Sequence, residues 1–131
     1  IGLRTYNDTD YGFEILTSPW VHRNGIQAAI EIALKRAEDT PVYLSFDIDG
    51  LDPAFAPGTG TPVCGGLASW QGLEFVRALE PLNLIGMDIV EVSPAYDTAE
   101  ITALAAANIA YDWIALIAKK NGAPCSFVGK I

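Results

Sequence analysis

The sequence contains few of the residues that build thiolate-metal, disulfide or imidazole-rich sites. It has two cysteines and one histidine in 131 residues. Cys64 and Cys125 lie far apart, and neither has a partner at the spacing of a zinc motif. This argues against a thiolate zinc site. No signal peptide is visible, and we expect reduced thiols in the cytoplasm.

Basic residues are also scarce, since 8 Lys and Arg stand against 16 Asp and Glu for a net charge of −8. This sign opposes phosphate-backbone binding, so nucleic acid is not an expected partner, whereas a small cationic substrate would be mildly favoured. Apolar residues make up 50% of the chain and charged residues 18%, which excludes a disordered chain. The apolar runs are short, and we expect none of them to span a membrane.

The length of the chain suits one domain with a sizeable core. The chain starts at Ile1 rather than at methionine, and the apolar run IGLRT opens it without a polar lead-in. We therefore expect it to be a portion of a longer protein.

Three segments have the apolar spacing of helices. The pattern predicts helices over 26–37, with Asn24 as the cap, and over 69–79, with the first residue as the cap. A long helix is predicted over 101–117, with Thr98 or a neighbour as its cap. Its shared apolar face comprises Ile101, Ala105, Ile109, Trp113 and Ile117. The core candidates among the aromatic residues are Trp20, Trp70 and Trp113.

Compact apolar runs between these helices predict strands. The runs over 42–46 and 84–90 are typical of strands buried on both faces, and shorter strands are expected at 1–5 and 126–128. The segment 47–66 is rich in Asp, Gly and Pro and predicts a long ordered loop, the kind of segment that often carries function. The alternation predicts an α/β fold with a parallel sheet covered on both sides.

Three aspartates follow the first buried strand in SFDIDGLDP, residues 45–53. Ligands of open parallel sheets bind beyond the carboxyl ends of the strands. On an extended chain Asp47 and Asp49 would point the same way, and a hard divalent metal would offset their repulsion. The alternative, equally supported by these residues, is that they cap a helix or stabilise a turn. Asp52 precedes Pro53 and is interpreted as a structural turn residue.

A second polar position follows the next predicted strand, in MDIVEVSP. Glu91 ends the apolar run, and Pro94 turns the chain away. The Glu91 carboxylate could bind a metal, act as a base, or pair with a planar guanidinium, whose fork of donors matches a carboxylate. A solvated strand-end residue is the alternative. Asp88 lies inside the run and is interpreted as a buried, hydrogen-bonded support.

The single histidine and the loop cysteine receive structural interpretations. His22 lies in PWVHRNG before a predicted helix, where a surface or helix-capping role is expected. A cysteine nucleophile would need a histidine base and an acid beside Cys64, and the sequence shows neither. Cys64 is therefore interpreted as a small buried thiol.

The segments SFDIDGLDPAFAPGTGTPVCGG and MDIVEVSPAYD strongly resemble the carboxyl-terminal half of the ureohydrolase family, which includes arginases and agmatinases. The resemblance runs from IGLR at the start to the helix AEITALAAANIAYDWIALIA, with both motifs in the family's order and approximate spacing. It implies a three-layer α/β/α fold with a mainly parallel sheet, arginase/deacetylase-like. Residues 1–131 would form the C-terminal portion of a single domain of this kind.

The resemblance also implies roles for four residues. Asp47 would bridge two manganese ions and Asp49 would bind one of them, because both match the paired aspartates of the family's SxDxDxxDP motif. Glu91 would hold the substrate guanidinium, and Thr61 of GTGTP would line the site near the substrate. The implied reaction is attack of metal-activated water on the guanidinium carbon, which releases urea and an amine.

The family's remaining metal ligands have no counterpart in this sequence. They come from a GGDH-type loop and a DAHxD motif, and His22 lies in a region that varies within the family. This chain carries only Asp47 and Asp49 of the ligand set, so by itself it should bind metal weakly and should not hydrolyse the substrate.

Two segments, PGTGTP and EVSPAYD, narrow the choice of substrate. They resemble the corresponding segments of agmatinases and guanidinobutyrases more than those of arginases. Agmatine, cleaved to putrescine and urea, is the expected substrate, with guanidinobutyrate and arginine as alternatives. The resemblance also implies a homo-oligomer, a trimer or a hexamer. Two alternatives remain from other classes: a noncatalytic module that keeps the fold for oligomer contacts, and an unrelated metal-free binding domain.

Overall fold

The computed structural model describes residues 12–123, in which helices alternate with two strands. The elements in chain order are α1 (Ser18–Ala37), β1 (Pro41–Asp47), the 3-10 turn η2 (Ile48–Gly50), α2 (Ser69–Ala78), β2 (Asn83–Val90), the 3-10 turn η3 (Pro94–Tyr96) and α3 (Ile101–Lys120). The strands expected at 1–5 and 126–128 lie outside the described residues.

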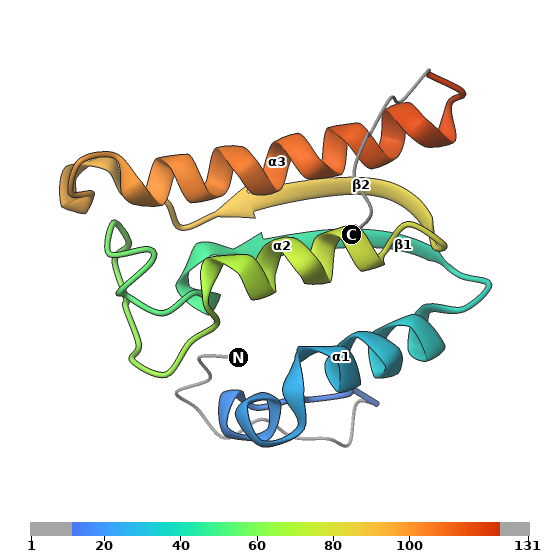
Figure 1. The fold of residues 1–131 in the computed structure, drawn as a ribbon, viewed down its shortest axis with the longest axis horizontal. Helices are drawn as coiled ribbons and strands as arrows, with labels where there is room; N and C mark the ends of the chain where they lie inside the picture. The colour runs from blue at the N-terminus through green and yellow to red at the C-terminus, as the bar shows by residue number, and fades with distance from the viewer. Residues whose placement is uncertain (1–11, 124–131) are drawn as a thin grey trace.

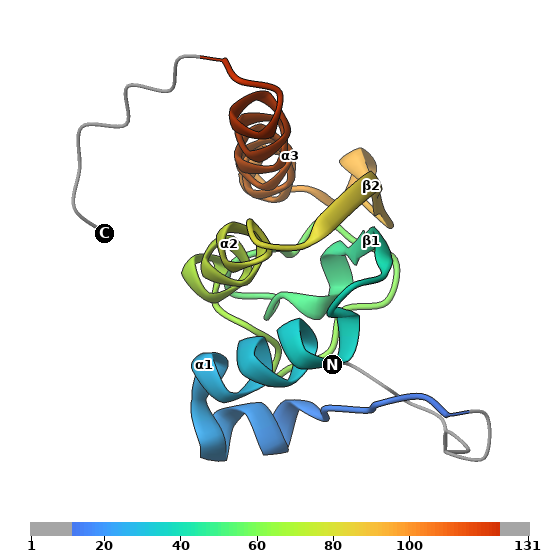
Figure 2. The ribbon, with the colours of Figure 1, turned by 90° about the vertical axis from the view of Figure 1, so that its right-hand side faces the viewer.

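The two strands pair in parallel, so that both end at the same edge of the sheet (Figure 1). Asp47 lies opposite Val90 at that edge. Helices α2 and α3 lie on the same side of the strand pair (Figure 2). The predicted α/β class with parallel strands is therefore confirmed. The prediction that the first strand is buried on both faces is wrong for the described chain, because Tyr43 is 56% exposed on the face that these helices leave open.

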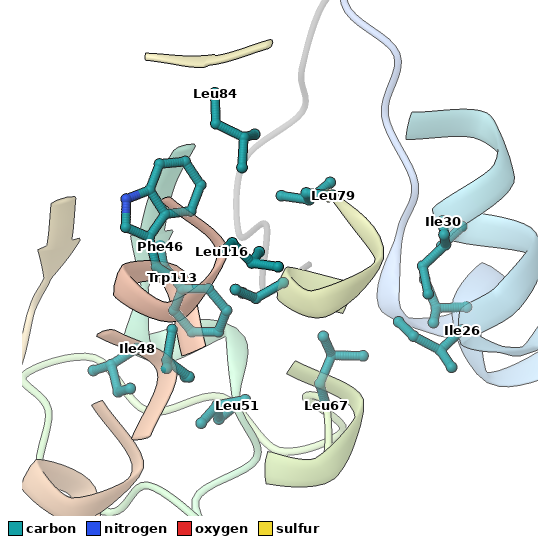
Figure 3. Close-up of a cluster of buried hydrophobic side chains, with 14 of the residues drawn as sticks. Ile26, Ile30, Phe46, Ile48, Leu51, Leu67, Leu79, Leu84, Trp113 and Leu116 are labelled. Atoms are coloured by element: carbon teal, nitrogen blue, oxygen red, sulfur yellow. The ribbon is translucent and has the colours of Figure 1, made fainter. Parts of the chain in front are cut away.

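The core forms where α2 and α3 pack on the sheet, and it extends under the loop that follows β1 (Figure 3). Phe46 comes from β1, while Trp113 and Leu116 come from α3. Ile48 and Leu51 continue this core beyond the strand and are 0% and 1% exposed. These two side chains anchor the segment that carries the aspartates, since fully burying an aliphatic side chain of this size contributes about 1.5–3 kcal/mol.

Helix α1 starts earlier than its apolar spacing predicts. It begins at Ser18 and is interrupted at Gly25, where φ is 85° and the backbone is not helical. Asn24 lies inside the first half and donates a hydrogen bond to the Trp20 carbonyl at 2.8 Å, so its predicted capping role is wrong. Sequence spacing detected only the half after Gly25, because the kink breaks the helical phase.

The other two helices begin at the predicted residues, Ser69 and Ile101, but the prediction of a cap is wrong at α2. Ala68, not Ser69, is the N-cap residue of α2, and its backbone N–H donates to the Gln71 side chain at 2.9 Å. At α3 the cap was predicted at Thr98 or a neighbour, and it is the neighbour Asp97, whose carboxylate accepts hydrogen bonds from two backbone N–H groups of the first turn. Caps depend on side-chain reach, which helical spacing does not encode.

Helix α3 is longer and more apolar than the short runs expected, and by length and composition it could cross a membrane. Its packing gives another reason for that composition. Ile109, Trp113 and Leu116 face the core, whereas Ile101, predicted on the same face, is 45% exposed. Asp112 on this helix pairs with Arg77 of α2 at 2.7 Å, which joins the two helices of the layer.

The three tryptophans occupy different environments. Trp113 is buried, Trp20 is half-buried and packs against the core, and Trp70 is 58% exposed. The core prediction is therefore wrong for Trp70, which lies in the first turn of α2.

Candidate active site at the carboxyl ends of the strands

The predicted site residues gather where β1 and β2 end. Asp47 is the last residue of β1, and Glu91 directly follows Val90, the last residue of β2. Since Asp47 pairs with Val90, the backbone brings Asp47 and Glu91 to neighbouring positions at one edge of the sheet. Both arrowheads point to this edge in Figure 1, and the loop between β1 and α2 folds back beside it.

Asp47 stabilises the turn that follows its strand. Its Oδ1 accepts a hydrogen bond from the Asp49 backbone N–H at 2.9 Å and so caps η2. The backbone at Ile48–Gly50 is therefore a 3-10 turn rather than an extended chain, and the premise of simple side-chain alternation is wrong here. The turn interpretation of Asp47 is confirmed. It does not compete with metal binding, because a carboxylate has about four lone-pair positions.

Asp49 is held by two threonine hydroxyl groups from the loop. Thr59 Oγ1 donates to Asp49 Oδ1, and Thr61 Oγ1 donates to Asp49 Oδ2. Thr59 is only 3% exposed, whereas Thr61 is exposed. Thr61, expected beside the substrate, thus lies against the second aspartate. Sequence reasoning did not single out Thr59, although the TGT spacing in GTGTP could have suggested a paired donor.

Glu91 lies in a sparsely populated backbone conformation. Its φ is 67°, in the left-handed region that residues other than glycine seldom occupy, and its side chain is exposed. The next residue, Val92, forms a bridge with Thr59, and the Ser93 N–H donates to the Gly58 carbonyl at 2.8 Å. The loop that holds Asp49 is thereby hydrogen-bonded to the segment that carries Glu91.

The start of α3 fixes the other side of Gly58. The Gly58 N–H donates to Thr102 Oγ1 at 2.7 Å, and Thr102 is fully buried. Burial raises the pKa of Asp97, but hydrogen bonds outweigh it, chiefly those from the backbone N–H groups of Thr102 and Ala103, with further ones from Thr98 and the Thr102 side chain, and leave that pKa below 3.8. Asp97 is therefore a charged cap at neutral pH and packs directly against Gly58.

Alanine at position 58 should destabilise the protein. A Cβ there would lie 2.6 Å from the Asp97 Cβ and 2.7 Å from its Cα, so the backbone would have to move. We expect Gly58→Ala to lower the free energy of unfolding by about 1–3 kcal/mol, as measured by urea denaturation. Gly60→Ala is the matched control, because nothing lies within 4 Å of its added Cβ. Equal losses in both variants would contradict a specific contact with Asp97.

Asp52 has the structural role predicted for it. Its carboxylate accepts the Ala54 N–H at 2.9 Å and the Gly65 N–H at 2.7 Å, and its own N–H donates to the Leu67 carbonyl. The two ends of the loop are thus joined. The hydrogen bond from Ala54, followed by that from Gly65, lowers the pKa of Asp52 below its ordinary value of 3.8.

This lowered pKa makes the contribution of Asp52 depend on pH. A carboxyl group with a depressed folded-state pKa stabilises the fold fully above its unfolded value of 3.8 and loses that contribution as pH falls through the folded value. Asp52→Asn should therefore be less stable than the unchanged protein at pH 6, with the gap closing below pH 3.8. Parallel denaturant titrations across this range measure the gap. A gap independent of pH would exclude the charged form as its cause.

His22 and Cys64 lie closer together than the sequence indicated. Both line a cavity of about 420 Å³ beside the start of α1. His22 is exposed as expected, and its Nε2 hydrogen-bonds to the Gly65 carbonyl at 2.8 Å rather than capping a helix. Cys64 is an exposed free thiol, so the buried interpretation is wrong. The thiol lies in a turn of the loop, outside the hydrophobic core.

Asp88 is also more exposed than predicted. It lies on the uncovered face of the sheet and accepts a hydrogen bond from the Tyr43 hydroxyl at 3.1 Å. This hydrogen bond raises the pKa of Tyr43. The hydrogen-bonded part of the prediction is confirmed, and the buried part is wrong for the described chain.

The donor chemistry at the strand ends suits a hard cation. Asp47 and Asp49 offer carboxylate oxygens, the ligands that manganese and magnesium prefer over thiolates. Among residues 12–123, no three histidine, cysteine or acidic side chains come together as a metal-binding group. This part of the chain can therefore contribute carboxylates to a metal centre without completing one.

Comparisons with known proteins agree with this geometry. An agmatinase from Chromobacterium violaceum is 54% identical over 92% of this chain and 38% of its own length. The crystal structure of a hypothetical agmatinase from Burkholderia thailandensis superposes with a TM-score of 0.87 at 53% identity, over 92% of this chain and 38% of that one. Proclavaminate amidino hydrolase from Streptomyces clavuligerus gives a TM-score of 0.82 at 36% identity, over 88% and 40% of the two chains.

These relatives are longer proteins, and this chain spans about 40% of their length. The family model described as Arginase family matches residues 1–115. The chain therefore belongs to the arginase family.

Proposed function

We propose that the protein carrying this chain hydrolyses a guanidino compound, agmatine in the first place, to putrescine and urea. The observation that carries the proposal is the shared strand edge. There Asp49 is held by Thr59 and Thr61, and the same loop is hydrogen-bonded to the segment of Glu91. The relatives named as agmatinases support agmatine over other guanidino compounds.

Asp47 and Asp49 would contribute to a site for two manganese ions. Their carboxylates match the oxygen ligands that this cation accepts, and the acidic chain as a whole attracts cations. When bound, manganese supplies Lewis-acid activation of water. The protein groups keep the carboxylates in place: Ile48 and Leu51 bury the turn, and the threonine hydroxyls orient Asp49.

Glu91 would position the substrate. A carboxylate and a guanidinium form two parallel hydrogen bonds in one plane, which fixes the orientation of the guanidinium carbon. The left-handed backbone at Glu91 supports this role, because strained conformations of this kind cluster at functional sites. Thr61 is exposed beside Asp49 and would lie near the bound substrate.

We also infer the setting in which the protein works. The single described cysteine is a free thiol, which supports a cytoplasmic location. A homo-oligomer, a trimer or hexamer, remains our proposal from the resemblance to the ureohydrolases. The net negative charge supports a cationic small-molecule partner and disfavours nucleic acid.

Urea release tests the proposed function. The complete polypeptide encoded by the open reading frame would be assayed with agmatine, guanidinobutyrate and arginine, each with and without manganese. We expect manganese-dependent release that is fastest with agmatine. Fastest release from another member of the panel would correct the substrate. Bound manganese without urea from any of the three would contradict the hydrolase proposal, and no bound manganese would favour a noncatalytic module.

A further inference from the structure

Thr59 connects the two halves of the strand-end site. Its side chain donates to Asp49 Oδ1, while its backbone forms the bridge to Val92, next to Glu91. It is 3% exposed, in contrast to the exposed Thr61 on the other oxygen of Asp49. Thr59 therefore contacts Asp49, the proposed metal ligand, through its hydroxyl group, and the segment of Glu91, the proposed substrate-binding residue, through its backbone.

The residue before Thr59 is fixed on both of its backbone polar groups. The Gly58 N–H donates to the buried Thr102 hydroxyl, and the Gly58 carbonyl accepts from the Ser93 N–H. Asp97 packs against the same glycine and allows no side chain there. The Thr59 backbone is consequently held by α3 and by the segment after β2, so its hydroxyl group is presented to Asp49 from a rigid support.

A threonine suits this task better than a serine. Its branched Cβ restricts χ1, and burial of its methyl group restricts it further, so the direction of the hydroxyl group is fixed before any ligand binds. A carboxylate has about four lone-pair positions, so the hydrogen bonds from Thr59 and Thr61 orient Asp49 without excluding a cation. Groups that orient a metal-binding carboxylate in this way raise metal affinity.

We propose that Thr59 is a positioning residue that orients Asp49 for manganese through its hydroxyl group and keeps Glu91 in register with Asp49 through its backbone. The first part rests on the proposed metal-binding role of Asp49. The proposal predicts that the effect on metal binding can be separated from the effect on Glu91, because a change of side chain removes the hydroxyl group but leaves the backbone bridge to Val92.

Two substitutions test the hydroxyl group in the complete polypeptide. Thr59→Val keeps the shape and removes the donor, and we expect its manganese dissociation constant to rise roughly 10–100-fold. Thr59→Ser keeps the donor and should restore most of the affinity. Electron paramagnetic resonance of free Mn²⁺ during titration gives these constants without any assay of activity. At saturating manganese, the KM of Thr59→Val for the guanidino substrate should equal that of the unchanged protein.

Thr40→Val is the matched control, since the Thr40 hydroxyl donates to the Ala37 carbonyl at the opposite end of β1. Its manganese affinity should not change. The proposal would be overturned by a Thr59→Val protein that binds manganese as tightly as the unchanged protein, even if its metal-free melting temperature falls. If the unchanged protein binds manganese and Thr59→Val weakens that binding as expected, but the unchanged protein releases no urea, this inference stands and the proposed function fails.

Discussion

Asp47→Asn in the complete polypeptide is expected to lower manganese-dependent urea release by at least roughly a thousandfold. The metal stabilises the transition state by several kcal/mol. Its loss lowers the rate by this factor, because each tenfold change in rate corresponds to about 1.36 kcal/mol. Asparagine retains a side-chain oxygen that can accept the Asp49 N–H, so the cap of η2 should survive. Elemental analysis of the purified variant should find less manganese per chain than in the unchanged protein.

Comparison with Asp47→Ala separates the two roles of this carboxylate. Alanine removes the cap as well as the charge, and we expect a further loss of about 1 kcal/mol in the free energy of unfolding. Asp39→Asn makes the same charge change before the other end of β1, where asparagine tolerates the φ of 60°, and it should leave metal content intact. Full metal content and full activity in Asp47→Asn would refute the metal-ligand role.

The sequence predicted best what depends on local periodicity and on short motifs. The apolar runs placed β1 and β2 within a residue of their ends, and those ends located Asp47 and Glu91 at one edge of the sheet. The turn role of Asp52 followed from its place before Pro53 and is confirmed by its two backbone partners. These features are encoded within a few residues of one another, so spacing and propensity are sufficient to find them.

Features that depend on tertiary contacts were missed. Thr59 and Asp49 are ten residues apart in the loop, and the residue before Thr59 is held by Asp97, Ser93 and the start of α3, which are far away in the sequence. Spacing placed the cap of α3 at Thr98 or a neighbour but could not single out Asp97, because its reach to the first turn depends on the left-handed residues that precede the helix.

Exposure was the least predictable property of the sheet. An apolar run such as 42–46 indicates burial on both faces only if helices cover both faces. In the described chain α2 and α3 cover one, and Tyr43 and Asp88 are exposed together on the other. The rest of the fold determines which segments cover a strand, so the sequence of the strand alone does not predict it.

Glu91→Gln should separate substrate binding from metal binding. The amide keeps the size of the side chain but loses the charge and one acceptor oxygen, so it cannot pair with a guanidinium through two parallel hydrogen bonds. We expect kcat/KM for agmatine to fall roughly 100- to 1,000-fold, which corresponds to about 3–4 kcal/mol. Manganese content should stay at the level of the unchanged protein. Metal loss equal to that of Asp47→Asn would contradict the division of roles between the two carboxylates.

Glu91→Gly provides an independent test of whether the strained backbone serves function rather than stability. A non-glycine residue in the left-handed region costs about 1–2 kcal/mol, and glycine avoids most of this cost. Because φ at Glu91 is 67°, the glycine variant should unfold at the same or a higher denaturant concentration while losing activity as Glu91→Gln does. A substitution that improves stability and removes turnover would mean that the carboxylate is kept at this position for what it binds. If Glu91→Gly instead destabilised the fold, the side chain would have a packing role that its exposure does not predict.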